Sequence, residues 1–185
     1  MGTVLALFVR LALPLTILRW PLAGAVLSIA ADTIDILIFN ALGFPHIGYQ
    51  QFDKLLDLYY LSLELVVVRR WAPFERTVAS ALFAWRLAGV LLFEALGVRV
   101  ALLLFPNMFE VYYLLVLATR RWAPAYEFTP ARTVVALCVL LVPKLAQEYA
   151  LHYARWLDNL VAFDVISDIW RWIGDRLQLL PGANG

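Results

Sequence analysis

The chain has 185 residues, of which 63% are hydrophobic and only 16% charged, and its formal net charge is +1. A soluble domain of this length leaves too much of its surface in water to bury so many apolar side chains. The near-neutral charge offers no electrostatic basis for binding nucleic acid. Composition therefore predicts an all-α integral membrane protein with no nucleic-acid partner, and the single cysteine, Cys138, excludes an intrachain disulfide.

The amino-terminal stretch, residues 3–18, is apolar but is interrupted by Arg10. A secretory signal would begin with a charge and continue as an uninterrupted apolar run, and this stretch does neither. We predict a short helix that lies at the membrane interface, with Arg10 reaching the lipid headgroups. A sixth membrane span is the alternative for these residues.

Five further stretches are apolar enough to cross a bilayer, which requires roughly 20 residues of helix. They are residues 21–43, 51–69, 77–97, 100–119 and 131–153. The connections between them are short, so consecutive helices should be antiparallel neighbours. The prediction is a polytopic bundle of about five transmembrane helices, formed by residues 1–157 as one domain.

Two segments of the chain repeat each other, near residues 37–73 and 91–124. The first reads LIFNALG, FDKLLDLYYL and RRWAP, and the second reads LLFEALG, FPNMFEVYYL and RRWAP. Such self-similarity indicates a repeated supersecondary unit, here a two-helix membrane hairpin. Asp57 and Glu110 occupy matching positions, so we expect them at comparable depth in the bundle.

The arginines predict the orientation of the chain. They gather in turns that should share one face of the membrane: Arg10, Arg19, Arg69, Arg70, Arg76, Arg120, Arg121 and Arg132. The positive-inside rule places this face in the cytoplasm of a bacterial cytoplasmic membrane. Trp20, Trp71 and Trp122 follow arginines in these turns and are typical of an aromatic belt at the interface.

The carboxyl-terminal segment, residues 158–185, differs from the spans. Charged residues such as Asp164 and Asp168 alternate at helical spacing with apolar ones such as Val165 and Ile169. This pattern predicts an amphipathic helix that lies on the membrane or on a partner.

Ionisable and polar residues inside the spans mark the candidate site. They are Asp32, Asp35, Asp53, Asp57, Arg86, Glu94, Asn107, Glu110, Lys144 and Glu148. A charge at membrane depth costs at least roughly 2.5 kcal/mol, so these side chains should face the bundle interior. We predict an acidic polar cavity in which Arg86 pairs with Asp35, Asp57, Glu94 or Glu110. The alternative is a set of buried ion pairs that only fix helix register.

Four of these residues, Asp32, Asp35, Asp53 and Asp57, offer hard oxygen ligands suited to Mg²⁺ or Mn²⁺. Their spacing, Asp32-x2-Asp35 followed by Asp53-x3-Asp57, resembles that of the CDP-alcohol phosphatidyltransferases. The resemblance implies two bound metal ions and one aspartate that acts as base on an acceptor alcohol. The residues between the aspartates depart from the family motif, at Ile36, Phe39, Asn40 and Tyr49.

Three functions follow from these patterns. The leading one is a non-enzymatic membrane protein that binds or transports an ion, a small solute or a lipid headgroup. The second is a membrane-embedded, metal-dependent phosphotransferase that uses the four aspartates. The third is a non-catalytic subunit of a larger membrane complex. Because five spans are few for a complete transporter, we expect a homo-oligomer or a membrane-protein partner.

Overall fold

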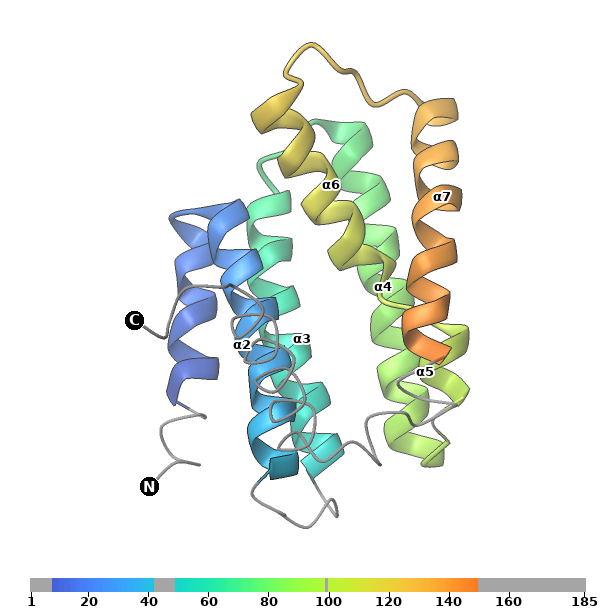
Figure 1. The fold of residues 1–185 in the computed structure, drawn as a ribbon. Helices are drawn as coiled ribbons and strands as arrows, with labels where there is room; N and C mark the ends of the chain where they lie inside the picture. Colours follow the sequence, from blue (N-terminus) through green and yellow to red (C-terminus); the bar gives the residue numbers. More distant parts are fainter. Residues whose placement is uncertain (1–7, 42–48, 99, 150–185) are drawn as a thin grey trace, which may run out of the picture.

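The computed structural model describes residues 8–41, 49–98 and 100–149, and their side chains except those of residues 33–54 (Figure 1). These residues are helical, with no strand among them. The helices are η1 (Leu13–Leu18), α2 (Pro21–Ala41), α3 (Tyr49–Val68), α4 (Pro73–Leu96), α5 (Val100–Leu104), α6 (Met108–Trp122) and α7 (Pro130–Glu148). The predicted amphipathic helix at 158–185 lies outside the described residues.

Three segments are long and apolar enough to cross a membrane: Pro73–Leu96, Val100–Trp122 and Pro130–Glu148. They support the assignment as a membrane protein, whereas the five-span arrangement stays a prediction. Helix α7 presents Val134, Val135, Val139 and Val142 outward, each 59–71% exposed. An exposed valine row is unfavourable in water but suits contact with lipid.

The amino-terminal helix, Phe8–Leu18, packs along α2 and α3 rather than apart from them (Figure 1). Its Ile17 is completely buried. A Cβ placed on Gly24 of α2 would lie only 2.5 Å from the Ile17 amide nitrogen, so glycine permits the close approach. Residues 8–18 are therefore a packed part of the bundle, and their position at the membrane interface stays a prediction.

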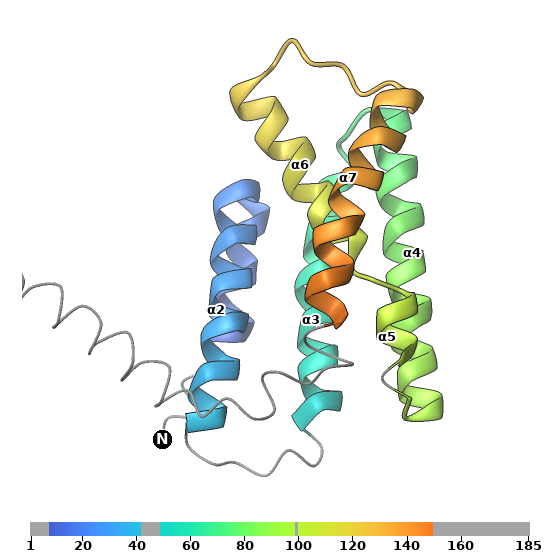
Figure 2. The ribbon, with the colours of Figure 1, turned by 45° about the vertical axis from the view of Figure 1, so that its right-hand side comes forward.

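The predicted span 100–119 is not one continuous helix. Helix α5 ends at Leu104, α6 begins at Met108, and Figure 2 shows them as two pieces beside α4. Pro106 accounts for the break, since proline has no amide hydrogen and its ring clashes with the preceding turn. Asn107 then caps α6 by accepting a hydrogen bond from the Glu110 amide at 3.4 Å. The matching residues of the first repeat, Asp53 and Lys54, lie in the uninterrupted α3.

The main apolar core forms where α3, α4 and α6 meet the amino-terminal helix. Its largest buried aromatic residues are Trp71, Phe109, Tyr112 and Tyr113. The Trp71 ring stacks on Tyr113 with centroids 5.4 Å apart. Trp71 is only 5% exposed, so its prediction as an interface tryptophan is wrong, whereas Trp20 and Trp122 are exposed.

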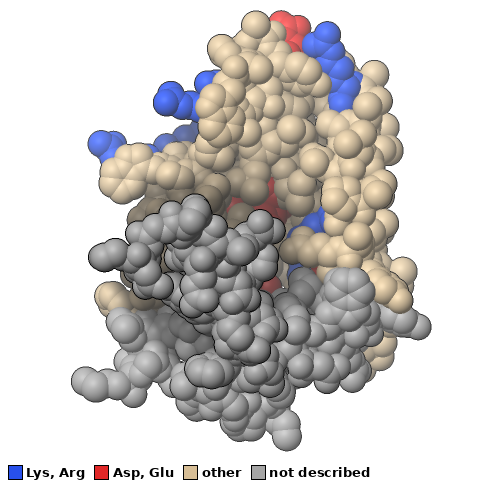
Figure 3. All heavy atoms as spheres, viewed as in Figure 1, with Lys and Arg blue, Asp and Glu red and all other residues tan. Residues whose placement is uncertain are grey.

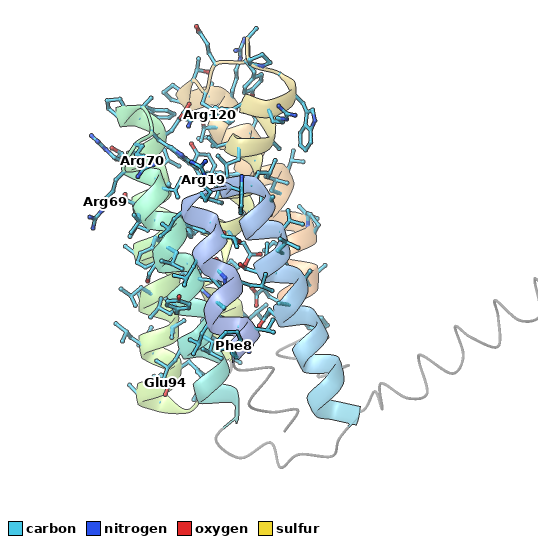
Figure 4. The ribbon with its side chains drawn as sticks, turned by 90° about the vertical axis from the view of Figure 1, so that its left-hand side faces the viewer. Phe8, Arg19, Arg69, Arg70, Glu94 and Arg120 are labelled. Atoms are coloured by element: carbon cyan, nitrogen blue, oxygen red, sulfur yellow. The ribbon has the colours of Figure 1, made fainter. Side chains whose placement is uncertain are left out.

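The arginine-rich turns lie at one end of the bundle. Figure 4 shows Arg19, Arg69, Arg70 and Arg120 near this end and Glu94 near the other. Arg120 pairs with Glu75 of α4, and its guanidinium lies 4.9 Å from the centre of the Trp71 ring. These contacts join the carboxyl end of α6 to the start of α4.

Gly89 of α4 packs directly against the helix break. A Cβ at this position would lie 2.3 Å from the Phe105 Cβ, closer than carbon atoms can approach. Gly89→Ala should therefore displace the break and lower the free energy of unfolding by about 1–3 kcal/mol, as overpacked sites do. Thermal unfolding in detergent would measure this loss. Ala81→Val, on the exposed side of the same helix, is the control, and equal stability of both variants would contradict the prediction.

Candidate functional site

Charged and polar side chains line the inside of the bundle. Figure 3 shows acidic and basic side chains within a hollow on the face seen in Figure 1. The buried members of this group are Arg10, Asp57, Glu64, Arg86, Asn107, Lys144 and Glu148, each at most 8% exposed. They come from the amino-terminal helix, α3, α4, the α5–α6 break and α7, so the polar interior joins segments far apart in sequence.

Arg10 lies inside the bundle between two aspartates. Its Nη2 atom contacts the Asp32 carboxylate of α2 and lies 3.4 Å from the Asp57 Oδ1 atom of α3. Its side chain is 6% exposed, so the expectation that it reaches the headgroups is wrong. Buried charge needs an opposite charge nearby, and the two aspartates supply it.

This arrangement bears on the predicted metal site. Asp32 and Asp57 share the Arg10 guanidinium, whereas the side chains of Asp35 and Asp53 lie outside the described residues. In the part of the chain that the structure describes, no three His, Cys, Asp or Glu side chains are placed to hold a metal ion. The two described aspartates thus hold an arginine, and the four-aspartate metal site stays a prediction.

Glu110 of α6 is the acceptor of a second polar group. The Tyr60 hydroxyl donates a hydrogen bond to its carboxylate, and Asn107 Nδ2 donates another at 3.0 Å. Tyr60 follows Asp57 by three residues on α3, so both lie on the same face of that helix. The negative charges of Glu110, Asp57, Glu64 and Asp32 all act on the Tyr60 hydroxyl. The repeat partners Asp57 and Glu110 thus adjoin one interior network.

Glu64 lies one helical turn beyond Tyr60 and is completely buried. Among the described residues, neither of its carboxylate oxygens has a hydrogen-bond partner, and the buried Tyr113 hydroxyl has none either. Glu64 is absent from the residues predicted for the site. The sequence pattern that could have placed Glu64 in the site is its spacing of seven residues from Asp57, because this spacing puts both residues on one face of α3.

Two charged side chains hold the two ends of the broken helix. Arg86 Nη1 of α4 donates a hydrogen bond of 3.1 Å to the Phe105 carbonyl at the end of α5. Glu148 of α7 accepts one of 3.3 Å from the Asn107 amide at the start of α6. Cations are favoured at helix carboxyl ends and anions at amino ends, so both charges complement the backbone dipoles that the break exposes.

Lys144 completes the group on α7. Its Nζ atom lies 3.5 Å from Glu148 Oε1 and donates a 3.1 Å hydrogen bond to Gln147. Pro143 precedes it inside the helix. The pair is buried, since Lys144 is 8% exposed and Glu148 3%, and it anchors α7 to the break.

Two predicted site residues occupy other places than expected. Arg86 faces the interior, but within the described residues it forms no ion pair, and its Nε atom has no partner. The described partner of Arg86 is thus a carbonyl, because the break offers unpaired backbone acceptors, and the Asp35 side chain lies outside the described residues. Glu94 is exposed on α4, at the end of the bundle away from the labelled arginines (Figure 4), and does not join the interior group.

Comparisons of the chain with protein-family models, with curated proteins and with solved structures found no match. The functional argument therefore depends on the residues themselves.

Proposed function

We propose that this protein is a membrane carrier that binds a small cation in its acidic interior and moves it across the bilayer. The observation that carries the proposal is the excess of interior acids over bases among the described residues: Asp32, Asp57, Glu64, Glu110 and Glu148 lie there with Arg10, Arg86 and Lys144, and Asp32 and Glu110 are only partly buried. Asp32 and Asp57 share Arg10, and Glu148 pairs with Lys144. Glu64 and Glu110 form no ion pair with any described Lys or Arg. Buried carboxylates without a basic partner require a bound cation, a proton or water.

The broken helix supports the same proposal. Irregular backbone at membrane depth persists only where it is buried in protein or lines a polar cavity. In many transporters, discontinuous helices form the ion and substrate sites near the middle of the membrane. Here the break at Phe105–Asn107 is next to Glu110, and its two ends form hydrogen bonds with Arg86 and Glu148.

Orientation and assembly are part of the proposal. The arginine-rich end would face the cytoplasm of a bacterial cytoplasmic membrane, by the positive-inside rule. Because the chain is small for a carrier, it would act as a homo-oligomer or with a membrane-protein partner. The outward-facing valines of α7 offer an apolar surface for lipid or for such a partner.

Cation flux into vesicles tests the proposal. The purified full chain, reconstituted into liposomes, should move at least one of Na⁺, K⁺ or H⁺ down an imposed gradient, followed with ion-sensitive dyes. Glu110→Gln should lower that flux at least about tenfold, equivalent to about 1.4 kcal/mol of lost interaction, because the network loses its charge. Glu94→Gln, at an exposed position of α4, is the matched control and should behave as wild type. If wild-type vesicles move none of the three ions, the protein is not a cation carrier and the accessory-subunit alternative gains.

A further inference from the structure

We infer that the transported cation is a proton and that Glu64 carries it as a neutral carboxylic acid, exchanging it with Glu110. This inference deepens the carrier function proposed above and depends on it. It starts from a carboxyl group that is completely buried and has no hydrogen-bond partner among the described residues.

An ionised Glu64 would be costly where the structure places it. The residue has 0% exposure, and neither oxygen is hydrogen-bonded to a described residue. No described Lys or Arg side chain forms an ion pair with it. An isolated buried carboxylate costs several kcal/mol, and a buried group in this position takes up a proton instead. Glu64 is therefore a neutral acid in the form that the structure describes.

The geometry favours a proton over a metal ion as the neutralising cation. Ca²⁺ and Mg²⁺ require about six or more oxygen ligands around one centre. Among the described residues no acidic, His or Cys cluster of three is placed to hold a metal, and Glu64 has no oxygen at hydrogen-bonding distance. A proton needs only the one carboxyl oxygen to which it bonds.

The groups that face Glu64 define where its proton can go. Tyr60 lies one helical turn before Glu64 on α3 and donates a hydrogen bond to Glu110 of α6, which places Glu110 beside the same face of α3. The Tyr113 hydroxyl of α6 is also buried and, among the described residues, forms no hydrogen bond, so it does not hold the Glu64 carboxyl. No cation among these groups would hold Glu64 in the ionised form.

Among the described side chains, the interior charges on the other elements packed on α3 have partners. Asp32 of α2 pairs with Arg10 of the amino-terminal helix, and Arg10 also contacts Asp57. On α4, Glu75 pairs with Arg120. Arg86 donates to the Phe105 carbonyl at the break. Among the described side chains, Glu64 is thus the interior acid that has neither an ion pair nor a hydrogen bond.

In the exchange step the proton passes from the Glu64 carboxyl to the Glu110 carboxylate. The O–H bond of the Glu64 carboxyl breaks, an O–H bond forms on a Glu110 oxygen, and the negative charge moves in the opposite direction. The Glu110 carboxylate accepts hydrogen bonds from Tyr60 and Asn107 and has further lone pairs on its oxygens to which a proton can bond. Protonation of Glu110 would weaken both hydrogen bonds, and Asn107 borders the helix break. Whether the proton is on Glu64 or on Glu110 therefore affects the hydrogen bonds of Asn107 beside the helix break.

Infrared spectroscopy tests the state of Glu64 independently of transport. The full chain in lipid vesicles at neutral pH should show the C=O stretch of a protonated carboxyl, shifted in D₂O as exchangeable protons require. Glu64→Gln, which has nearly the shape of the neutral acid, should fold and lose this band. Glu94→Gln should retain it. Persistence of the full band in Glu64→Gln would overturn the inference.

Flux measurements then separate this inference from the function on which it rests. Wild-type vesicles should move H⁺, and Glu64→Gln should reduce this flux to the level of protein-free vesicles, while Glu94→Gln does not. If the wild type moves Na⁺ or K⁺ but not H⁺, the carrier function stands and the proton inference fails. If it moves none of the three, both fail. Undiminished H⁺ flux in Glu64→Gln would assign the proton to another group.

Discussion

Replacing Arg10 with alanine should lower the free energy of unfolding by about 3 kcal/mol, the lower end of the range for breaking a buried ion pair. Arg10 holds Asp32 and Asp57 together, and its side chain is 6% exposed. Without it two carboxylates face each other in a poorly solvated interior. The estimate is at the lower end because the Asp32 side chain is 24% exposed and retains some hydration. Titration with a denaturing detergent, followed by circular dichroism, measures the loss.

Two further variants test the cause of this effect. Arg19→Ala removes an exposed arginine near the same helix and should cost little, since exposed charges contribute about 0–1 kcal/mol. Adding Asp32→Asn and Asp57→Asn to Arg10→Ala should restore much of the stability, because the uncompensated charges disappear. If the triple variant is as unstable as Arg10→Ala alone, lost packing rather than charge explains the effect.

Trp71→Ala should be at least as damaging, with a loss of about 3–5 kcal/mol, as is typical of large aromatic residues removed from a core. Trp71 is 5% exposed, stacks on Tyr113 and lies edge-on to Tyr112. Its ring also faces the Arg120 guanidinium, an interaction that adds about 0.5–2 kcal/mol. Thermal unfolding in detergent, followed by circular dichroism, would show the lowered midpoint.

The repeat supplies the matched control. Trp122 stands in the same RRWAP sequence as Trp71 but is 74% exposed. Trp122→Ala should change stability by less than about 1 kcal/mol, since no cavity forms. Equal losses in the two variants would mean that the repeat copies are packed alike, contrary to the structure.

Local features of the chain were predictable because they depend on neighbouring residues. Long apolar runs predicted membrane helices, and three such helices are present among the described residues. The break within 100–119 was missed even though Pro106 marks it, because the apolar run continues on both sides. Burial of Arg86, Asn107, Lys144 and Glu148 follows from the cost of charge and polarity in a membrane, but their partners do not.

The packing of the helices decides which ion-pair and hydrogen-bond partners the interior charges have. Arg10 meets Asp32 and Asp57 across 22 and 47 residues of sequence, and Glu148 reaches Asn107 across 41. No local pattern relates residues so far apart, since helical periodicity shows only which side chains share a face. Two identical RRWAP segments likewise place one tryptophan in the core and the other outside. Sequence alone therefore determined a helical membrane protein with charges inside, because hydrophobic burial and the helical period act locally. Only the tertiary structure shows that Glu64 has no basic partner among the described residues, because that depends on which faces of α3 and α6 meet.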